Sequence, residues 1–192
     1  MPIHTLLSME SEAVLAHDWG VLKKTTFSYQ GRYGTWKTQT RGTYDRGNGA
    51  TILLYNRERK TVLLTRQFRF PAYVNGHNGW LIEACAGLLD RETPEEAIRR
   101  ETQEELGYRI AAPKKLFEVF MSPGSVTERL AFFMAPYEAA CQLTPGGGVE
   151  EEEIEVLEVP FEDTVAMIDS GEIVDGKTIM LLLYARLHQV FE

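Results

Sequence analysis

The sequence predicts an α/β protein, and more closely an α/β/α sandwich in which helices cover the faces of mixed sheets. Short apolar runs rich in β-formers recur between polar turns in the first two thirds of the chain, which is typical of strands. Helical signals appear at residues 94–106 and again after residue 160. With 192 residues and 44% hydrophobic content, the chain can bury one full core.

The N-terminal quarter differs from the rest of the chain. Residues 1 to about 12 are predicted to form a loose arm or a short helix. Residues 19–46 alternate β-formers with glycines, which indicates two or three exposed strands or hairpins. We therefore divide the chain into an N-terminal segment at 1–46 and a main domain at 47–192.

The main domain begins with a predicted central hairpin, because apolar runs at 51–55 and 61–65 flank a polar turn at 56–60. An apolar run at 79–86 also reads as a strand. Further strands are expected at 114–120 and 128–135, on either side of a turn at 122–125, and at 154–159. Helices are expected at 161–169 and 177–191.

Composition narrows the class of protein. The net charge of −8 and the pI near 5.1 disfavour a nucleic-acid scaffold or a membrane-surface role, so we expect neither partner. Two cysteines, Cys85 and Cys141, imply no disulfide framework and suit a reducing cytoplasm. No signal peptide is visible, and no apolar run reaches the length of a membrane span.

Three glutamates in one predicted helix are the best indication of chemistry. Glu101, Glu104 and Glu105 stand at i, i+3 and i+4, which places them on one helical face. Like charges at this spacing destabilise a helix by roughly 0.2–0.5 kcal/mol per pair, whereas Mg²⁺ or Mn²⁺ would supply the compensating charge. A solvated acidic helix is the alternative interpretation. The helix itself is well marked, because residues 93–96 form a capping box with proline at the first helical position and Gly107 is a natural stop.

The segment from Gly87 to Tyr108 resembles the Nudix box, Gly-x5-Glu-x7-Arg-Glu-U-x-Glu-Glu-x-Gly-U, in which U is a bulky apolar residue. The matching positions are Gly87, Glu92, Arg100, Glu101, Glu104, Glu105 and Gly107. Two departures are visible: the loop after Gly87 is one residue short, and Thr102 replaces an apolar residue. The resemblance implies the Nudix fold and metal-dependent hydrolysis of a nucleoside diphosphate linked to another group.

The resemblance also implies a metal site. Glu101 and Glu105 would be ligands for Mg²⁺, with Mn²⁺ as a possible substitute, and the backbone carbonyl of Ala86 would join them. Glu104 would ligate the metal or hold a metal-bound water. Bound Mg²⁺ ions polarise phosphoryl oxygens and lower the pKa of an attacking water. Arg100 would orient the glutamates, with an exposed helix salt bridge as the alternative.

Beyond the box, the segments at 44–50, 66–69, 85–90, 122–124, 146–150 and 175–178 resemble bacterial GDP-mannose pyrophosphatases. These belong to the nucleoside-diphosphate-sugar branch of the family, which also contains ADP-ribose pyrophosphatase and shares the short box loop. The branch implies a homodimer whose N-terminal strands complete the partner's active site. Segment 19–46 suits that dimerisation role.

Substrate-binding residues follow from the same resemblance. Arg69 would contact the diphosphate, and Gly87 would lie against the substrate. Trp19 would stack on the nucleobase, or anchor the core or the dimer interface instead. Lys177 would contact the sugar or a phosphate, unless it is a solvated lysine at a helix start. The residues that would reach the nucleotide from the other subunit are Thr40, Arg41 and Gly42.

The general base has two candidates. The acidic run at 150–153 follows three glycines and resembles a loop that closes over the metals. In that interpretation Glu152 would be a metal ligand, while Glu150 or Glu151 would orient or deprotonate water, and Glu151 would also contact substrate. Glu128 is the rival base, and it too would lie near the substrate. Sequence does not decide between them, because a base must lie within hydrogen-bond reach of the attacking water.

Three functions remain open at this point. The first is hydrolysis of GDP-mannose to GMP and mannose 1-phosphate. The second is hydrolysis of ADP-ribose to AMP and ribose 5-phosphate. The third is a catalytically inactive Nudix-fold sensor of nucleotide sugars, which the intact glutamate set argues against.

Overall fold

The computed structural model describes residues 6–149 and 153–192. The chain divides into two compact units. The first unit comprises Met1–Asn48 and Val119–Arg129, and the second comprises Gly49–Glu118 and Leu130–Glu192. Among the described residues, no helix combines the length and apolar character needed to cross a membrane.

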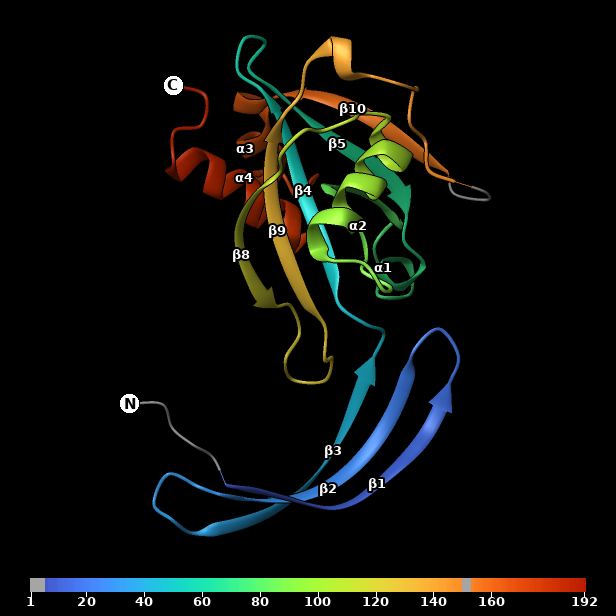
Figure 1. Cartoon of the computed structure of the whole chain (residues 1–192), viewed down its shortest axis with the longest axis vertical. Helices are drawn as coiled ribbons and strands as arrows, with labels where there is room; N and C mark the ends of the chain where they lie inside the picture. Colours follow the sequence, from blue (N-terminus) through green and yellow to red (C-terminus); the bar gives the residue numbers. More distant parts are fainter. Residues whose placement is uncertain (1–5, 150–152) are drawn as a thin grey trace. The chain divides into compact units, whose positions relative to one another are not determined.

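The first unit is built on a three-stranded antiparallel sheet in the order β1-β2-β3 (Figure 1). Its strands are β1 (Leu7–His17), β2 (Val21–Gln30) and β3 (Trp36–Asp45). The turn between β2 and β3 requires a left-handed backbone at Gly34, where φ is +78° and glycine has no steric penalty. The expectation of two or three strands in segment 19–46 is confirmed by β2 and β3.

The expectation of a loose arm or helix at the N-terminus is wrong from Leu7 onward. Residues 7–17 form β1, which pairs along its length with β2 from Leu7 opposite Tyr29 to His17 opposite Val21. The local sequence is rich in Met, Glu, Ala and Leu, which are good helix formers. Cross-strand pairing overrides that weak local preference. Residues 1–5 lie outside the described part of the chain.

The second unit contains a seven-stranded mixed sheet in the order β10-β5-β4-β9-β8, with β6 paired to β5 and β7 paired to β4. The pairing of β4 with β9 is parallel, while β4 and β5 form the predicted antiparallel hairpin. Its strands are β4 (Gly49–Asn56), β5 (Thr61–Phe68), β6 (Trp80–Glu83), β7 (Cys85–Leu88), β8 (Lys114–Phe120), β9 (Arg129–Pro136) and β10 (Ile154–Pro160). The apolar run at 79–86 is thus two short strands divided at Ala84.

Helices cover the faces of this sheet, as predicted for an α/β/α sandwich (Figure 1). Helix α2 (Pro94–Glu101) packs on β4 and β7, and α4 (Gly176–Leu187) packs on β4. Alternate residues of β4, among them Ile52 and Leu54, join Ile98 and Leu106 in one buried apolar cluster. The remaining helices are α1 (Phe70–Val74), η1 (Thr102–Leu106), η2 (Ala139–Cys141) and α3 (Phe161–Asp169).

The C-terminal helix is shorter than the predicted 177–191. Helix α4 ends at Leu187, and Gln189 adopts a left-handed backbone with φ of 50°. The aromatic ring of Phe191 then stacks on the ring of Phe161, with centroids 4.2 Å apart. This ring contact holds the last residues against α3, so packing ends the helix before its sequence pattern does.

Candidate active site

Helix α2 carries the first part of the predicted glutamate cluster, and its start is fixed by the predicted capping box. The Thr93 hydroxyl accepts a hydrogen bond from the Glu96 backbone N–H at 3.3 Å. The Glu96 carboxylate in turn accepts one from the Thr93 backbone N–H at 2.9 Å. Both bonds satisfy donors that the first helical turn leaves unpaired.

The helix does not continue as a regular α-helix through the cluster. Residues Thr102–Leu106 form one π-helical turn, η1, which ends at Gly107 with φ of +77°. Ile98, Thr102 and Leu106 are fully buried, so the predicted stripe does face the core. The Thr102 hydroxyl replaces an apolar group there without an unpaired donor, because it donates to the Ile98 carbonyl at 2.6 Å.

Arg100 ties two of the three glutamates together. Its Nη1 donates to Glu101 at 2.9 Å and to Glu104 at 3.0 Å, while its Nε donates to Glu92 at 2.9 Å. A planar guanidinium suits several carboxylates at once. Arg100 therefore has the geometry of an orienting residue, and Glu92 keeps its place beside the helix despite the shortened loop.

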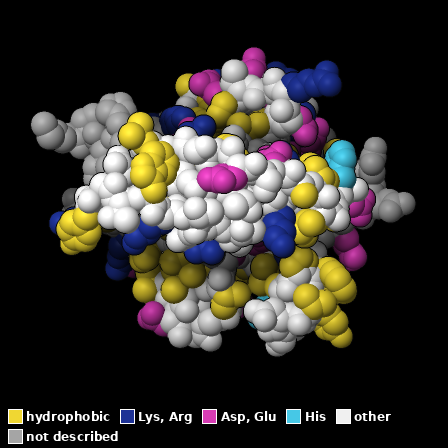
Figure 2. Space-filling view, turned by 90° about the horizontal axis from the view of Figure 1, so that it is seen from below, with side chains coloured by type: hydrophobic (Ala, Val, Ile, Leu, Met, Phe, Trp, Pro, Cys, Tyr) yellow, Lys and Arg dark blue, Asp and Glu magenta, His cyan; other side chains and the backbone are white. Residues whose placement is uncertain are grey.

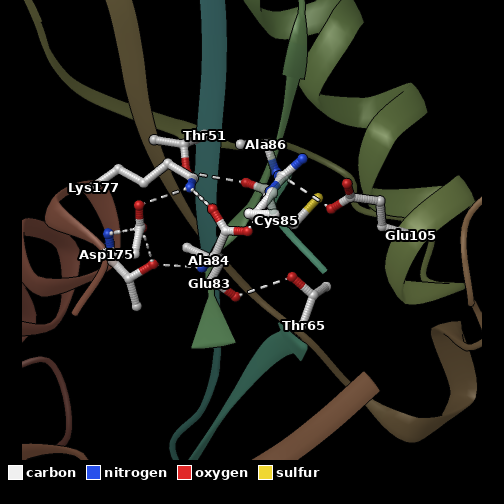
Figure 3. A network of polar contacts seen from close by, with 11 residues as sticks. Thr51, Thr65, Glu83, Ala84, Cys85, Ala86, Glu105, Asp175 and Lys177 are labelled. Carbon is white, nitrogen blue, oxygen red and sulfur yellow. Dashed lines mark hydrogen bonds and ion pairs between the residues drawn. The ribbon is translucent and has the colours of Figure 1, made fainter. Parts of the chain in front are cut away.

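Glu105 occupies the most buried position of the cluster, with 5% of the residue exposed. Its carboxylate accepts a hydrogen bond from the Ala86 backbone N–H at 3.3 Å, and the Cys85 side chain points toward it (Figure 3). Burial raises the pKa of Glu105 to about 7, and the nearby negative charge of Glu101 adds to the increase. Hydrogen bonds from Cys85 and Ala86, together with the positive charge of Arg69, oppose it.

Gly87 makes room for the Glu101 carboxylate. A Cβ atom built on Gly87 would lie 1.9 Å from Oε1 of Glu101 and 2.0 Å from its Cδ. The absence of a side chain therefore lets the carboxylate approach the backbone of β7. Gly87 and Ala86 are adjacent in β7, so Glu101 and Glu105 meet the same short strand.

These donors fit a hard divalent cation, because carboxylate and carbonyl oxygens are the ligands that Mg²⁺ and Mn²⁺ prefer. Two carboxylates held in a buried setting, each raising the other's electrostatic cost, are stabilised by a cation. Within residues 6–149 and 153–192, no three His, Cys, Asp or Glu side chains are grouped to hold a metal by themselves. The predicted set instead counts two carboxylates, the Ala86 carbonyl and Glu152, and Glu152 lies outside the described residues.

Arg69 and Lys177, the two predicted substrate-binding cations of the second unit, meet at one carboxylate. Arg69 Nε donates to Glu83 at 2.7 Å, and Lys177 Nζ donates to the other oxygen of Glu83 (Figure 3 shows the Lys177 contact). Sequence reasoning did not select Glu83. The signal was present, because a single carboxylate in the apolar run at 81–86 requires a buried partner.

The triple-glycine loop docks on the glutamate helix. The Gly147 N–H donates to the Glu105 carbonyl at 2.9 Å, and the Gly148 N–H donates to the Glu104 carbonyl at 3.1 Å. A Cβ atom on Gly146 would lie 2.4 Å from the Glu105 carbonyl oxygen, so only glycine permits this approach. The predicted loop residues Glu150, Glu151 and Glu152 follow directly but lie outside the described residues.

The other predicted substrate residues belong to the first unit. Trp19, between β1 and β2, is 92% exposed. Thr40 and Arg41 lie in β3, where the Thr40 hydroxyl is 2.9 Å from that of Thr26 and Gly42 pairs with Lys24. Glu128 is half-buried, with its carboxylate 4.0 Å from Arg46.

Comparison with known proteins agrees with the box geometry. Residues 45–180 match the family model described as NUDIX domain, and residues 8–44 match the model described as GDP-mannose pyrophosphatase NudK N-terminal domain. The two matches meet between Tyr44 and Asp45, the last two residues of β3. Nudix hydrolases generally use a divalent metal ion, which fits the donor set at Glu101 and Glu105.

Several curated relatives are similar over nearly the whole chain. A GDP-mannose pyrophosphatase of Yersinia enterocolitica is 56% identical over 176 residues, which cover 91% of this chain and 92% of the relative. One of Pectobacterium atrosepticum is 53% identical over 180 residues, covering 93% of each. One of Yersinia pestis is 55% identical over 176 residues, covering 91% of this chain and 89% of the relative. The chain therefore belongs to the Nudix hydrolase family.

Proposed function

We propose that this protein hydrolyses the diphosphate bond of a nucleoside diphosphate sugar, and that its preferred substrate is GDP-mannose, which gives GMP and mannose 1-phosphate. The observation that carries the proposal is the convergence of Glu101 and Glu105 on the Ala86–Gly87 strand. Three relatives that are at least 53% identical over most of the chain are named GDP-mannose pyrophosphatases, which supports the choice of substrate.

We assign the metal site to the carboxylates of Glu101 and Glu105 and the carbonyl of Ala86, with Glu152 as a further ligand. When bound there, Mg²⁺ polarises phosphoryl oxygens and lowers the pKa of an attacking water. Arg100 holds Glu101 and Glu104 in place. Glu104 would ligate the metal or hold a metal-bound water. Mn²⁺ is an expected substitute because it favours the same oxygen donors.

Around the metal site, Arg69 supplies a cation for the diphosphate, and Lys177 supplies one for the sugar or a phosphate. The positive charge of Arg69 acts on the Glu105 carboxyl, which supports a place for Arg69 beside the glutamate cluster. Water adds across the bridging P–O bond, so one phosphate stays on the nucleoside and the other on the sugar. The base that takes the water's proton is Glu128 or one of Glu150 and Glu151.

We further propose a homodimer whose first unit contributes to the partner's active site. All residues of β1 are exposed in the single chain, among them Leu7, Met9, Val14 and Leu15. Hydrophobic side chains also reach the surface in several groups in the space-filling view (Figure 2). Burial of such side chains against a second copy would stabilise the strands. Trp19, Thr40, Arg41 and Gly42 would then meet the nucleotide bound by the partner.

A cytoplasmic location completes the proposal. Both Cys85 and Cys141 are free thiols, and Cys85 is fully buried beside the glutamate cluster. Free thiols suit a reducing compartment. Neither thiol has a role in the proposed reaction.

Substrate preference is tested with GDP-mannose, ADP-ribose and other diphosphate sugars in the same Mg²⁺ buffer, with products identified by chromatography. We expect the highest kcat/KM for GDP-mannose, because a site bonded to the guanine edge leaves polar groups unpaired when adenine enters. An equal or higher kcat/KM for ADP-ribose would show that ADP-ribose is the preferred substrate. No turnover of any member of the panel, with retained nucleotide-sugar binding, would assign a sensor.

The metal assignment is tested by Glu101→Gln and Glu105→Gln. Each substitution should lower kcat by orders of magnitude while the protein stays folded, because glutamine keeps the shape of the glutamate side chain but lacks its charge. Turnover like that of the unaltered protein in both variants would refute the assignment.

The dimer is tested by light scattering of the full chain, for which we expect twice the chain mass of 21.8 kDa. Mixing Trp19→Ala protein with Glu101→Gln protein should restore activity if sites are shared between subunits, since one site of each mixed dimer keeps both residues. An active monomer would contradict this part of the proposal.

A further inference from the structure

Glu83 is a buried carboxylate that joins three elements distant in the sequence. Its side chain is 4% exposed at the end of β6. Arg69 approaches it from the segment after β5, and Lys177 approaches it from the first turn of α4. Burial of a carboxylate without partners is costly, and the two cations compensate that cost at Glu83.

The two cations differ in how much of each remains available. Lys177 is 12% exposed and sits between Glu83 and Asp175, with its Nζ 3.1 Å from Asp175. Arg69 is 40% exposed and bonds Glu83 through Nε. Within residues 6–149 and 153–192, its two terminal nitrogens donate to no other group. The Arg69 guanidinium is therefore held through Nε, while its two terminal nitrogens remain available to a ligand.

The backbone around this carboxylate is fixed as well. The Arg69 N–H donates to the Gly79 carbonyl at 2.7 Å, which anchors the residue that carries the guanidinium. The Ala84 N–H donates to the Thr178 hydroxyl at 2.6 Å, and that hydroxyl donates to Asp175. Figure 3 shows the chain running from Glu83 through Cys85 to Ala86, whose backbone N–H donates a hydrogen bond to the Glu105 carboxylate.

The charges of this group cancel. Arg69 and Lys177 carry two positive charges, and Glu83 and Asp175 carry two negative charges. A diphosphate therefore gains little from the net charge of the group and depends on directed donors. Donors that are already held in the binding geometry increase affinity because less side-chain freedom is lost on binding.

We infer that Glu83 is a positioning residue for the substrate: it holds the Arg69 guanidinium by Nε so that the two terminal nitrogens face the diphosphate of the nucleotide sugar. Lys177 is the counter-charge that allows Glu83 to be buried at that place. The inference rests on the proposed function, and it deepens it by assigning how the diphosphate cation is oriented. Glu83 acts through Arg69 and does not itself contact the substrate.

A double-mutant cycle tests the inference with Glu83→Gln, Arg69→Gln and the double variant, assayed on GDP-mannose with Mg²⁺. Each single variant should raise KM about 10-fold and change kcat less than about 3-fold, as expected for lost uniform binding. The double variant should resemble Arg69→Gln alone. Additive losses of about 100-fold, an unchanged KM or a lower KM in Glu83→Gln would overturn the inference. A lower KM would show that Glu83 competes with the substrate for the cations.

Two controls separate this role from a structural one. Glu155→Gln removes a carboxylate from Arg66, which is bonded through Nε at 2.8 Å on neighbouring strands, and should leave KM unchanged. If Glu83→Gln does not fold, Glu83→Gln is combined with Lys177→Met, which removes both buried charges. Arg69→Gln must then add nothing in that background, and a further rise in KM would overturn the inference.

Binding of GDP, measured by calorimetry with Mg²⁺, separates this inference from the proposed function. If the unaltered protein hydrolyses no nucleotide sugar, the proposed function fails, and the same cycle in the Kd for GDP still tests Glu83. If the unaltered protein is active and the cycle is additive, the inference fails and the proposed function stands.

Discussion

Replacing Gly87 by alanine should separate activity from stability. The new Cβ would lie 1.9 Å from Oε1 of Glu101, whereas ordinary van der Waals contact begins at 3.4 Å. The carboxylate must therefore retreat by about 1.5 Å, the difference between these two distances. The atoms that move are the far end of a flexible side chain, and Gly87 does not have a left-handed backbone. Folding can accommodate the change, but the carboxylate of a proposed metal ligand is displaced.

The magnitude follows from that displacement. A shift of about 1 Å in a reacting group can reduce a rate by about 100-fold, so we expect kcat to fall at least 100-fold in Gly87→Ala. The free energy of unfolding should change by less than about 1 kcal/mol, because alanine also restricts the unfolded chain. The measurements are steady-state kinetics with GDP-mannose and urea unfolding of the same preparations.

The matched control is Gly124→Ala, because a Cβ at Gly124 meets nothing within 4 Å. That variant should keep both activity and stability. Full activity in Gly87→Ala would show that the Glu101 carboxylate is not needed where the structure has it. Loss of folding in Gly87→Ala would show that the Glu101 side chain cannot move away from the new Cβ without disturbing the surrounding structure.

Three further predictions concern the helix that carries the glutamates and its two ends. Burial raises the pKa of Glu105 from 4.5 to about 7, so the charged carboxylate destabilises the folded metal-free protein by about 3 kcal/mol above pH 7 and by nothing below pH 4.5. In urea unfolding with EDTA, Glu105→Gln should therefore be more stable than the unaltered protein at pH 8, and the difference should vanish toward pH 4.5. A less stable variant at pH 8 would contradict this. Thr93→Ala should cost about 1 kcal/mol in urea unfolding with kcat retained, because it removes the capping box but leaves Ile98 packed; unchanged stability would show that the cap is redundant. Gly107→Ala should lower the melting temperature strongly, because its Cβ would lie 2.1 Å from the Thr144 carbonyl oxygen at a φ of +77°. A melting temperature within about 2 °C of that of the unaltered protein would contradict this, because such a shift corresponds to less than about 1 kcal/mol.

Local signals in the sequence predicted the parts of the fold that depend on local chemistry. The capping box at Thr93, the stripe of Ile98, Thr102 and Leu106, and the stop at Gly107 each involve residues within a few positions of one another. The β4–β5 hairpin is of the same kind, because its turn and its apolar runs are adjacent.

Features that depend on distant partners were not predictable in this way. Strand β1 carries helix-forming residues and is a strand because β2 pairs with it. The partners of Glu83 lie 14 and 94 residues away, so the sequence could show that it needs partners but not which ones. The π-helical turn at Thr102–Leu106 lies where the distant glycine loop bonds to the helix, and the spacing of its glutamates is equally compatible with an α-helix.

That π-helical turn has a consequence for how the enzyme can diverge. Glu104 and Glu105 belong by their side chains to the proposed metal site, and their carbonyls accept hydrogen bonds from Gly148 and Gly147. Hydrogen bonds from a glycine backbone do not depend on the side chains that follow. Residues after Val149 can therefore be replaced, inserted or deleted without removing the donors of these two hydrogen bonds. A change of the residues after Val149 is thus separable in sequence from the helix that carries Glu101 and Glu105, but not from the proposed metal ligand Glu152. The three glycines mark the boundary between the segment that carries the proposed ligands Glu101 and Glu105 and the segment that carries the proposed ligand Glu152 and the candidate bases Glu150 and Glu151.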